Sequence, residues 1–188
     1  NLLRLRHCAP RYCFLQQAGL ANGFTVEEAA TVQLDGLRVS STGVRNALGV
    51  ADFTLAEALL GRPFQIAGRV LHGQKLGRQL GAPTANIQLK RKRVPLTGVY
   101  LVSIELDGQV WPGAANIGVR PSVKSDGLAH LEVHLLDYAG DLYGRHLSVT
   151  FHRKLRDEQR FASLDELKAA IAADIAAARA SWPGNHFQ

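Results

Sequence analysis

The chain has 188 residues, 46% hydrophobic and 20% charged, which is the composition of an ordinary globular protein rather than a disordered or fibrous one. Its apolar stretches are interrupted well before the roughly 20 residues that a membrane-spanning helix needs, and no export signal is visible. We therefore expect a cytoplasmic protein with no membrane partner.

The net charge of +6 arises in the middle of the chain, because residues 63–128 hold nine Lys and Arg against three Asp and Glu. Such a surplus favours a polyanionic partner, either a nucleic acid or a nucleoside triphosphate. A solvated basic surface would have the same composition, so charge alone leaves the choice open.

Helices are predicted in the first 60 residues. Residues 26–30 and 53–60 have helix-compatible composition, Asp52 is a suitable N-cap for the second segment, and Gly61 begins the sequence that ends it. The two cysteines, Cys8 and Cys13, lack the spacing of a zinc site, and we expect them to be reduced thiols. A domain boundary is predicted near residues 61–63.

From residue 64 onward the pattern changes to short alternating apolar runs separated by turn sequences such as Asp107-Gly108. The six runs are residues 64–70, 85–89, 99–106, 110–116, 131–136 and 147–151. Six short strands in about 90 residues predict a closed or nearly closed antiparallel barrel.

A long helix is predicted at the end of the chain. Ser163 and Glu166 have the spacing of a capping box, and apolar residues then recur at intervals of three and four. These apolar positions are Leu164, Leu167, Ile171 and Ile175, and Trp182-Pro183-Gly184 ends the helix. We expect this helix to lie across the barrel.

Three glycines at intervals of four, Gly73, Gly77 and Gly81, enclose Lys75 and Arg78. Glycine permits positive φ and removes the side chain that would keep an anion away from the backbone, so this loop is a candidate phosphate site. A flexible surface loop would look the same, and the glycines alone do not decide between the two.

The residues after the glycines favour a site. Pro83 fixes the backbone as it enters a strand, and Thr84 and Asn86, two residues apart, point to the same side of an extended chain. A hydroxyl and an amide oxygen on one face are suitable ligands for Mg²⁺. Ordinary polar residues at the start of a strand are the alternative.

A second group of polar residues lies on the predicted strand 131–136. Leu131, Val133 and Leu135 form its buried face, which leaves Glu132 on the opposite face between two histidines. The carboxylate of Glu132 is the candidate base for a hydroxyl that attacks phosphorus. A third segment, residues 153–161, is a basic loop that either closes over a ligand or only connects two elements.

These strings together resemble the riboflavin kinase module of the bacterial bifunctional riboflavin kinase/FMN adenylyltransferase (FAD synthetase) family. They run in family order across about 120 residues of the chain. The matching strings are Gly73–Gly77 with Arg78, Gly81–Asn86, Gly98–Tyr100, Ala115–Pro121, Leu131–Asp137, Asp141–Gly144 and Lys154–Gln159.

The resemblance implies a mainly β fold, a six-stranded antiparallel Greek-key barrel with a C-terminal α-helix, preceded by a short α/β remnant. It implies an enzyme that transfers the γ-phosphate of ATP to the ribityl 5′-hydroxyl of riboflavin to give FMN, with small-molecule substrates and no nucleic acid partner. Thr84 and Asn86 would hold Mg²⁺, the loop from Gly73 to Gly81 would bind ATP, and Glu132 would be the base and contact the flavin. Arg156 would also bind the flavin.

The first 60 residues resemble the end of the family's FMN adenylyltransferase domain, because Val39–Arg45 matches its Ser-Ser-Thr signature. The nucleotide-binding motif that lies upstream in the family is absent, so we expect no FAD synthesis by this chain. The predicted domains are an adenylyltransferase remnant at 1–60, a riboflavin kinase domain at 61–183 and a tail at 184–188. The alternative functions are a non-catalytic basic barrel that binds nucleic acid and a barrel that only senses flavin.

Overall fold

The computed structural model describes residues 10–27, 30–73, 82–89, 94–119 and 129–182. The chain divides into two compact units, Asn1–Arg38 and Val39–Gln188. The first unit contains helix α1 (Pro10–Asn22) and a two-stranded hairpin of β1 (Gln33–Leu34) and β2 (Leu37–Arg38). No described helix is both long enough and apolar enough to cross a membrane.

Two predictions for the first unit are wrong. The described residues of 26–30 are not helical; the helix is α1, which ends before Gly23, where the backbone turns left-handed with φ 73°. Cys13 is disulfide-bonded rather than a reduced thiol, because composition cannot tell whether two sulfur atoms come within bonding distance. Cys8 lies outside the described residues.

The second unit begins with two helices whose caps follow from the sequence. Helix α2 (Ser41–Gly49) starts after Ser40, whose hydroxyl accepts a hydrogen bond from the Gly43 N–H. Helix α3 (Phe53–Leu60) starts after Asp52, whose carboxylate accepts from the Leu55 N–H at 2.9 Å. Gly61 ends α3 in the left-handed conformation with φ 69°, so both predicted ends of this helix are confirmed.

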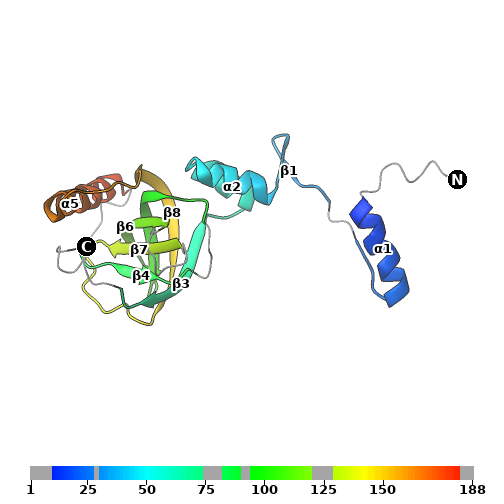
Figure 1. The fold of residues 1–188 in the computed structure, drawn as a ribbon, viewed down its shortest axis with the longest axis horizontal. Coiled ribbons are helices and arrows are strands. Elements are labelled where there is room, and N and C mark those ends of the chain that lie inside the picture. Colours follow the sequence, from blue (N-terminus) through cyan, green and yellow to red (C-terminus); the bar gives the residue numbers. More distant parts are fainter. Residues whose placement is uncertain (1–9, 28–29, 74–81, 90–93, 120–128, 183–188) are drawn as a thin grey trace. The chain divides into compact units, whose positions relative to one another are not determined.

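The remainder of the second unit is a closed six-stranded barrel (Figure 1). All its pairs are antiparallel and the strand order is β3-β4-β7-β6-β5-β8, in which β8, β5, β6 and β7 form a Greek key. The strands are β3 (Gln65–Leu71), β4 (Ala85–Ile87), β5 (Gly98–Leu106), β6 (Gln109–Val119), β7 (Ala129–Leu135) and β8 (His146–Arg156). The predicted barrel is confirmed, including the Asp107-Gly108 hairpin, where both residues have positive φ.

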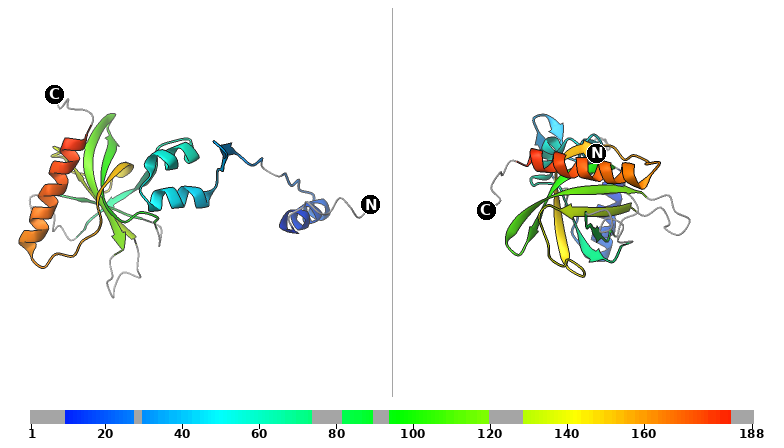
Figure 2. Two further views of the ribbon diagram at one scale, coloured as in Figure 1. Left: turned by 90° about the horizontal axis from the view of Figure 1, so that it is seen from above. Right: turned by 90° about the vertical axis from the view of Figure 1, so that its left-hand side faces the viewer.

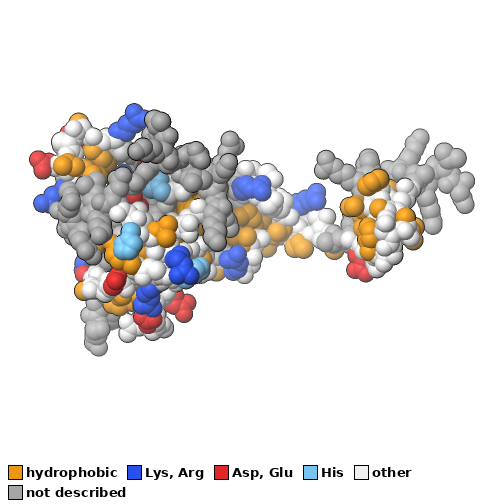
Figure 3. Space-filling view, turned by 60° about the horizontal axis from the view of Figure 1, so that its bottom comes forward, with side chains coloured by type: hydrophobic (Ala, Val, Ile, Leu, Met, Phe, Trp, Pro, Cys, Tyr) orange, Lys and Arg blue, Asp and Glu red, His pale blue; other side chains and the backbone are white. Residues whose placement is uncertain are grey.

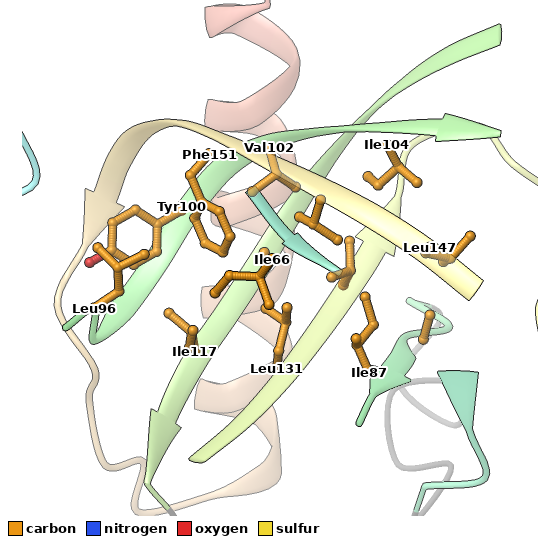
Figure 4. Packing of buried hydrophobic residues seen from close by; sticks show 14 of the residues in the cluster. Ile66, Ile87, Leu96, Tyr100, Val102, Ile104, Ile117, Leu131, Leu147 and Phe151 are labelled. Atoms are coloured by element: carbon orange, nitrogen blue, oxygen red, sulfur yellow. The ribbon is translucent and has the colours of Figure 1, made fainter. Parts of the chain in front are cut away.

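Alternating side chains fill the interior of the barrel. Strand β7 alternates between buried and half-buried residues along its whole length, and Leu131 points inward beside Ile117 of β6 (Figure 4). Phe53 at the start of α3 packs against Tyr100 and Phe151, with ring centroids 5.8 and 6.2 Å apart, and so joins α3 to the barrel core. The residues between the inward positions are therefore displayed on the outer surface.

Helix α5 (Leu164–Ser181) lies along the outside of the barrel and contacts β5, β6 and β8 (Figure 2). The Ser163 hydroxyl accepts a hydrogen bond from the Glu166 N–H, and the Glu166 carboxylate accepts one from the Ala162 N–H. A second apolar cluster fills the space beneath the helix, and its buried members are Leu101, Ala114, Leu136 and Ala178. Of the predicted apolar stripe, Leu164 is 62% exposed.

Candidate active site

A row of polar residues crosses the outer surface of the barrel. Asn86 of β4 is paired with Glu132 of β7, and Glu132 is paired on its other side with Asn116 of β6. All three are half-buried, while their neighbours Ala85, Ile87, Leu131, Val133, Ala115 and Ile117 are buried in the core. The register therefore places a carboxylate between two amides, on adjacent strands about 4.8 Å apart.

Asn86 is in close contact with the start of the glycine loop. A Cβ atom at residue 73 would lie within 3.0 Å of three atoms of the Asn86 side chain, so only glycine fits there without moving Asn86. Of the other predicted loop residues, Lys75, Gly77, Arg78 and Gly81 lie outside the described residues.

The segment that carries Thr84 is anchored to β7. Nδ1 of His134 is hydrogen-bonded to the carbonyl oxygen of Pro83 at 2.9 Å, which fixes the backbone one residue before Thr84. His134 lies on the same outward side of β7 as Glu132, because the two residues are separated by one buried position. The strand that positions the candidate base therefore also positions the candidate metal ligand.

A small open pocket lies beside Thr84. Its walls come from the ends of several strands and from the turn after β7, and they include Val70, Thr84, Val133, Leu135, Leu142 and Tyr143. Tyr143 also packs against the ring of His72, the residue before Gly73, with ring centroids 3.9 Å apart. The pocket is lined by both polar and apolar groups, and its walls include residues of both segments singled out from the sequence, Thr84 of one and Val133 of the other.

Arg156 lies at the far end of the row. Val99 of β5 pairs with Asn116 on one side and with Arg156 of β8 on the other. The Arg156 guanidinium donates two hydrogen bonds to the carboxylate of Asp174 in α5, and its centre lies 5.6 Å from the centroid of the Phe161 ring. No sequence pattern indicated the contact with Asp174.

The close approach of β5 to β8 depends on Gly98. This residue has φ 118°, a conformation that residues with a side chain rarely adopt, and a Cβ there would lie 2.5 Å from the carbonyl oxygen of Arg156. Next to it, Lys154 forms an ion pair with Asp157 at 2.5 Å, and this hydrogen bond raises the pKa of Lys154 above its usual value. Gly98 thus allows the backbone contact that brings Arg156 to the row.

Most of the predicted site residues that are described lie close together. Asn86 and Glu132 are neighbours on adjacent strands. Gly73 contacts the side chain of Asn86, and Thr84 precedes Asn86 by two residues in the chain. Asn116 was not among the predicted site residues. Two signals pointed to it: it stands in one of the strings that matched the family, and strand alternation turns it outward next to Glu132.

Comparison with known proteins identifies the family to which the barrel and helix α5 belong. Residues 60–182 match the family model described as flavokinase, riboflavin kinase. The chain belongs to the riboflavin kinase family. The match covers all six barrel strands and α5, and therefore every described residue of the row.

Two relatives share the name bifunctional riboflavin kinase/FMN adenylyltransferase. The protein from Pseudomonas fluorescens is 77% identical over 167 residues, and that from Escherichia coli K12 is 53% identical over 170 residues. In each case the alignment covers 89% of this chain and 54% of the relative. The chain thus spans about half the length of the curated relatives it matches.

A solved structure from Streptococcus pneumoniae, described as a macrolide-efflux protein, has a similar fold. It is 32% identical, with a TM-score of 0.69 over 89% of this chain and 55% of that one. The description refers to the pneumococcal protein, and the likeness concerns the arrangement of the elements.

Proposed function

We propose that this chain is an ATP:riboflavin kinase that converts riboflavin to FMN. The observation that carries the proposal is the pairing of Asn86 with Glu132 on the outer face of a barrel that belongs to the riboflavin kinase family. This pairing brings a candidate ligand for the phosphate-bound cation next to a candidate base, and phosphoryl transfer needs these two groups side by side.

ATP binds with its base toward the pocket beside Thr84 and its phosphates toward Gly73 and Asn86. The pocket supports this placement because Thr84 lines it and because its wall residue Tyr143 packs against His72, the residue before Gly73. The oxygens of Thr84 and Asn86 suit Mg²⁺, a hard cation that prefers oxygen ligands beside phosphates. When bound, the ion neutralises charge on the phosphates; the chain itself supplies the orientation.

Glu132 then acts on the flavin substrate. Its carboxylate accepts the proton of the ribityl 5′-hydroxyl, the hydroxyl oxygen forms a bond to the γ-phosphorus, and the bond to the β-phosphate oxygen breaks to release ADP. Arg156, at the end of the same row, contacts the flavin ring system. The products are FMN, ADP and one proton.

The charge distribution favours small anionic substrates over a nucleic acid. On the face shown in Figure 3, described basic and acidic side chains are interspersed. Arg145, for example, pairs with Asp107, and its guanidinium lowers the pKa of that carboxyl.

We place the enzyme in the cytoplasm, where ATP is available. We assign residues 1–60 to the end of an adenylyltransferase domain, and the names and alignments of the relatives support this assignment.

The test is a turnover assay with ATP, Mg²⁺ and riboflavin, in which FMN and ADP are both measured. We expect one ADP for each FMN, and we expect Glu132→Gln to abolish FMN formation while ADP and riboflavin still bind. Glu105→Gln, which changes an exposed carboxylate on β5, is the matched control and should be fully active. Absence of FMN from the unmodified chain, or full turnover by Glu132→Gln, would refute the kinase or the role of Glu132 respectively.

A further inference from the structure

Asn116 is distinguished by a buried oxygen atom with no partner. Its Oδ1 is shielded from solvent and accepts no hydrogen bond from the part of the chain that the structure describes. The side chain lies on the outer surface of the barrel, because Ala115 and Ile117 on either side of it point into the core. The atom is therefore an unused acceptor beside Glu132.

An acceptor of this kind is unfavourable for folding. A buried carbonyl oxygen without a donor costs about 1–3 kcal/mol, and native proteins keep few of them. The Oδ1 of Asn116 is not needed for strand pairing, since the ladders of β6 with β5 and β7 are made by backbone groups. A donor supplied by a ligand would explain why an amide stands there.

The position of Asn116 indicates which ligand group meets it. In strand order it lies between Glu132 on one side and Val99 followed by Arg156 on the other. The segment after β8 reaches the same face, because the Glu158 carboxylate packs directly over Gly118, the next outward position of β6. A substrate that extends from Glu132 toward Arg156 must pass over Asn116.

We propose that Asn116 binds the ribityl chain of the flavin, its Oδ1 accepting a hydrogen bond from a hydroxyl between the 5′-hydroxyl and the ring. The inference rests on the proposed kinase function and adds the residue that recognises a hydroxyl of the ribityl chain. A five-carbon chain held by its terminal hydroxyl at Glu132 is long enough to reach the neighbouring strand, about 4.8 Å away.

The decisive experiment compares two flavins. One is riboflavin; the other is the 5-hydroxypentyl analogue, which keeps the terminal hydroxyl and lacks the three inner ones. Loss of one hydrogen bond to a hydroxyl lowers kcat/KM by about tenfold, so Asn116→Leu should lose about tenfold with riboflavin and little with the analogue. Gln109→Leu, an exposed position on the same strand, should keep the preference of the unmodified chain. Equal losses with both flavins, or no loss, would overturn the proposal.

Two further measurements separate this role from folding and from the kinase reaction. Asn116→Leu removes an unpartnered acceptor and keeps the shape, so its melting temperature without ligand should be unchanged or higher, whereas an amide needed for structure would give a lower one. Flavin fluorescence gives the Kd of each flavin without turnover. If the unmodified chain binds both flavins equally, the assignment of Asn116 fails even if FMN is made. If the unmodified chain prefers riboflavin, Asn116→Leu loses that preference and no FMN is made, the kinase function fails and the binding role stands.

Discussion

The carboxylate of Asp174 in α5 accepts two hydrogen bonds from the guanidinium of Arg156 in β8, each 2.7 Å long. Asp174 is only 9% exposed, and Arg156 also donates to the carbonyl oxygen of Asp157. Because a planar guanidinium bonded to both carboxylate oxygens cannot rotate freely, the helix fixes the orientation of a residue assigned to the flavin. Helix α5 is thus connected to the proposed site through one ion pair.

We predict that Asp174→Asn weakens flavin binding more than it slows the chemical step. The change removes the charge that holds Arg156, so KM for riboflavin should rise about tenfold with a small change in kcat, and the free energy of unfolding should fall by about 2–3 kcal/mol. Steady-state kinetics and urea denaturation measure the two effects.

The matched control for Asp174 is a second ion pair between the same helix and the barrel. Arg179 donates to Asp137 at 2.8 Å, but both side chains are about half exposed. Arg179→Gln should therefore change stability by less than about 1 kcal/mol and leave KM for riboflavin unchanged. If Arg179→Gln raised KM as much as Asp174→Asn, the effect would come from general loosening of α5 rather than from Arg156.

A second prediction concerns the contact between Gly73 and Asn86. In Gly73→Ala the new methyl group occupies the space of the Asn86 side chain, which must turn away from its position beside Glu132. We expect a higher Mg²⁺ concentration for half-maximal activity and a kcat at least about tenfold lower, with a stability change below about 1 kcal/mol.

Gly49→Ala serves as the control for the glycine substitution. Gly49 ends α2, and a Cβ atom added there would lie 4.0 Å from its nearest neighbour, so a methyl group fits. Its Mg²⁺ dependence should match that of the unmodified chain. A normal Mg²⁺ dependence in Gly73→Ala would show that Asn86 does not contribute to the cation site.

A third prediction concerns pH. His152 lies 2.8 Å from the Ser103 hydroxyl and packs against Trp182. Partial desolvation of the ring lowers its pKa below 6.5, although Glu57 acts in the opposite direction. The unfolded chain therefore binds a proton more readily than the folded chain as pH falls below about 6.5, so stability is retained above that pH and decreases below it.

Replacing His152 by Gln should remove this contribution. Thermal melts between about pH 5 and about pH 8 should show a smaller loss of stability on acidification in His152→Gln than in the unmodified chain. Titration of the ring by NMR gives the pKa directly. A ring that titrates above 6.5 in the folded protein would contradict the prediction.

The barrel could be predicted because its signals are local. Alternation placed the strands to within a few residues, and the caps of α3 and α5 followed from Asp52, Gly61 and Ser163. The strand that was most underestimated is β8, expected at 147–151 and observed as His146–Arg156, because basic residues replace the alternating pattern in its second half. Tertiary pairing with β5 extends it there.

The site was only partly predictable, because its geometry depends on tertiary pairing rather than on local signals. Glu132 and Asn86 stood out by chemical type and by alternation. Alternation fixes the face on which each side chain lies, but which residue stands opposite which depends on the pairing of strands that are distant in sequence. Asp174 looked like one polar residue in an alanine-rich helix, and only the packing of α5 on β8 gives it a partner 18 residues away. Asn116 stands in a string that matched the family, but its position beside Glu132 follows only from the pairing of β6 with β7.

Strand β4 contains only three residues, so its pairing with each neighbouring strand is short. It forms two residue pairs with β3 and three with β7. A slip of one residue along β7 would place Ala85 or Ile87 opposite Glu132 and turn Asn86 into the core. We expect these short pairings to form last, and they carry the proposed base and a proposed ligand of the cation. During refolding, recovery of phosphoryl transfer should report the pairing of β4 with β3 and β7. It should occur later than recovery of the circular dichroism signal, which detects the longer β5–β6 and β5–β8 ladders.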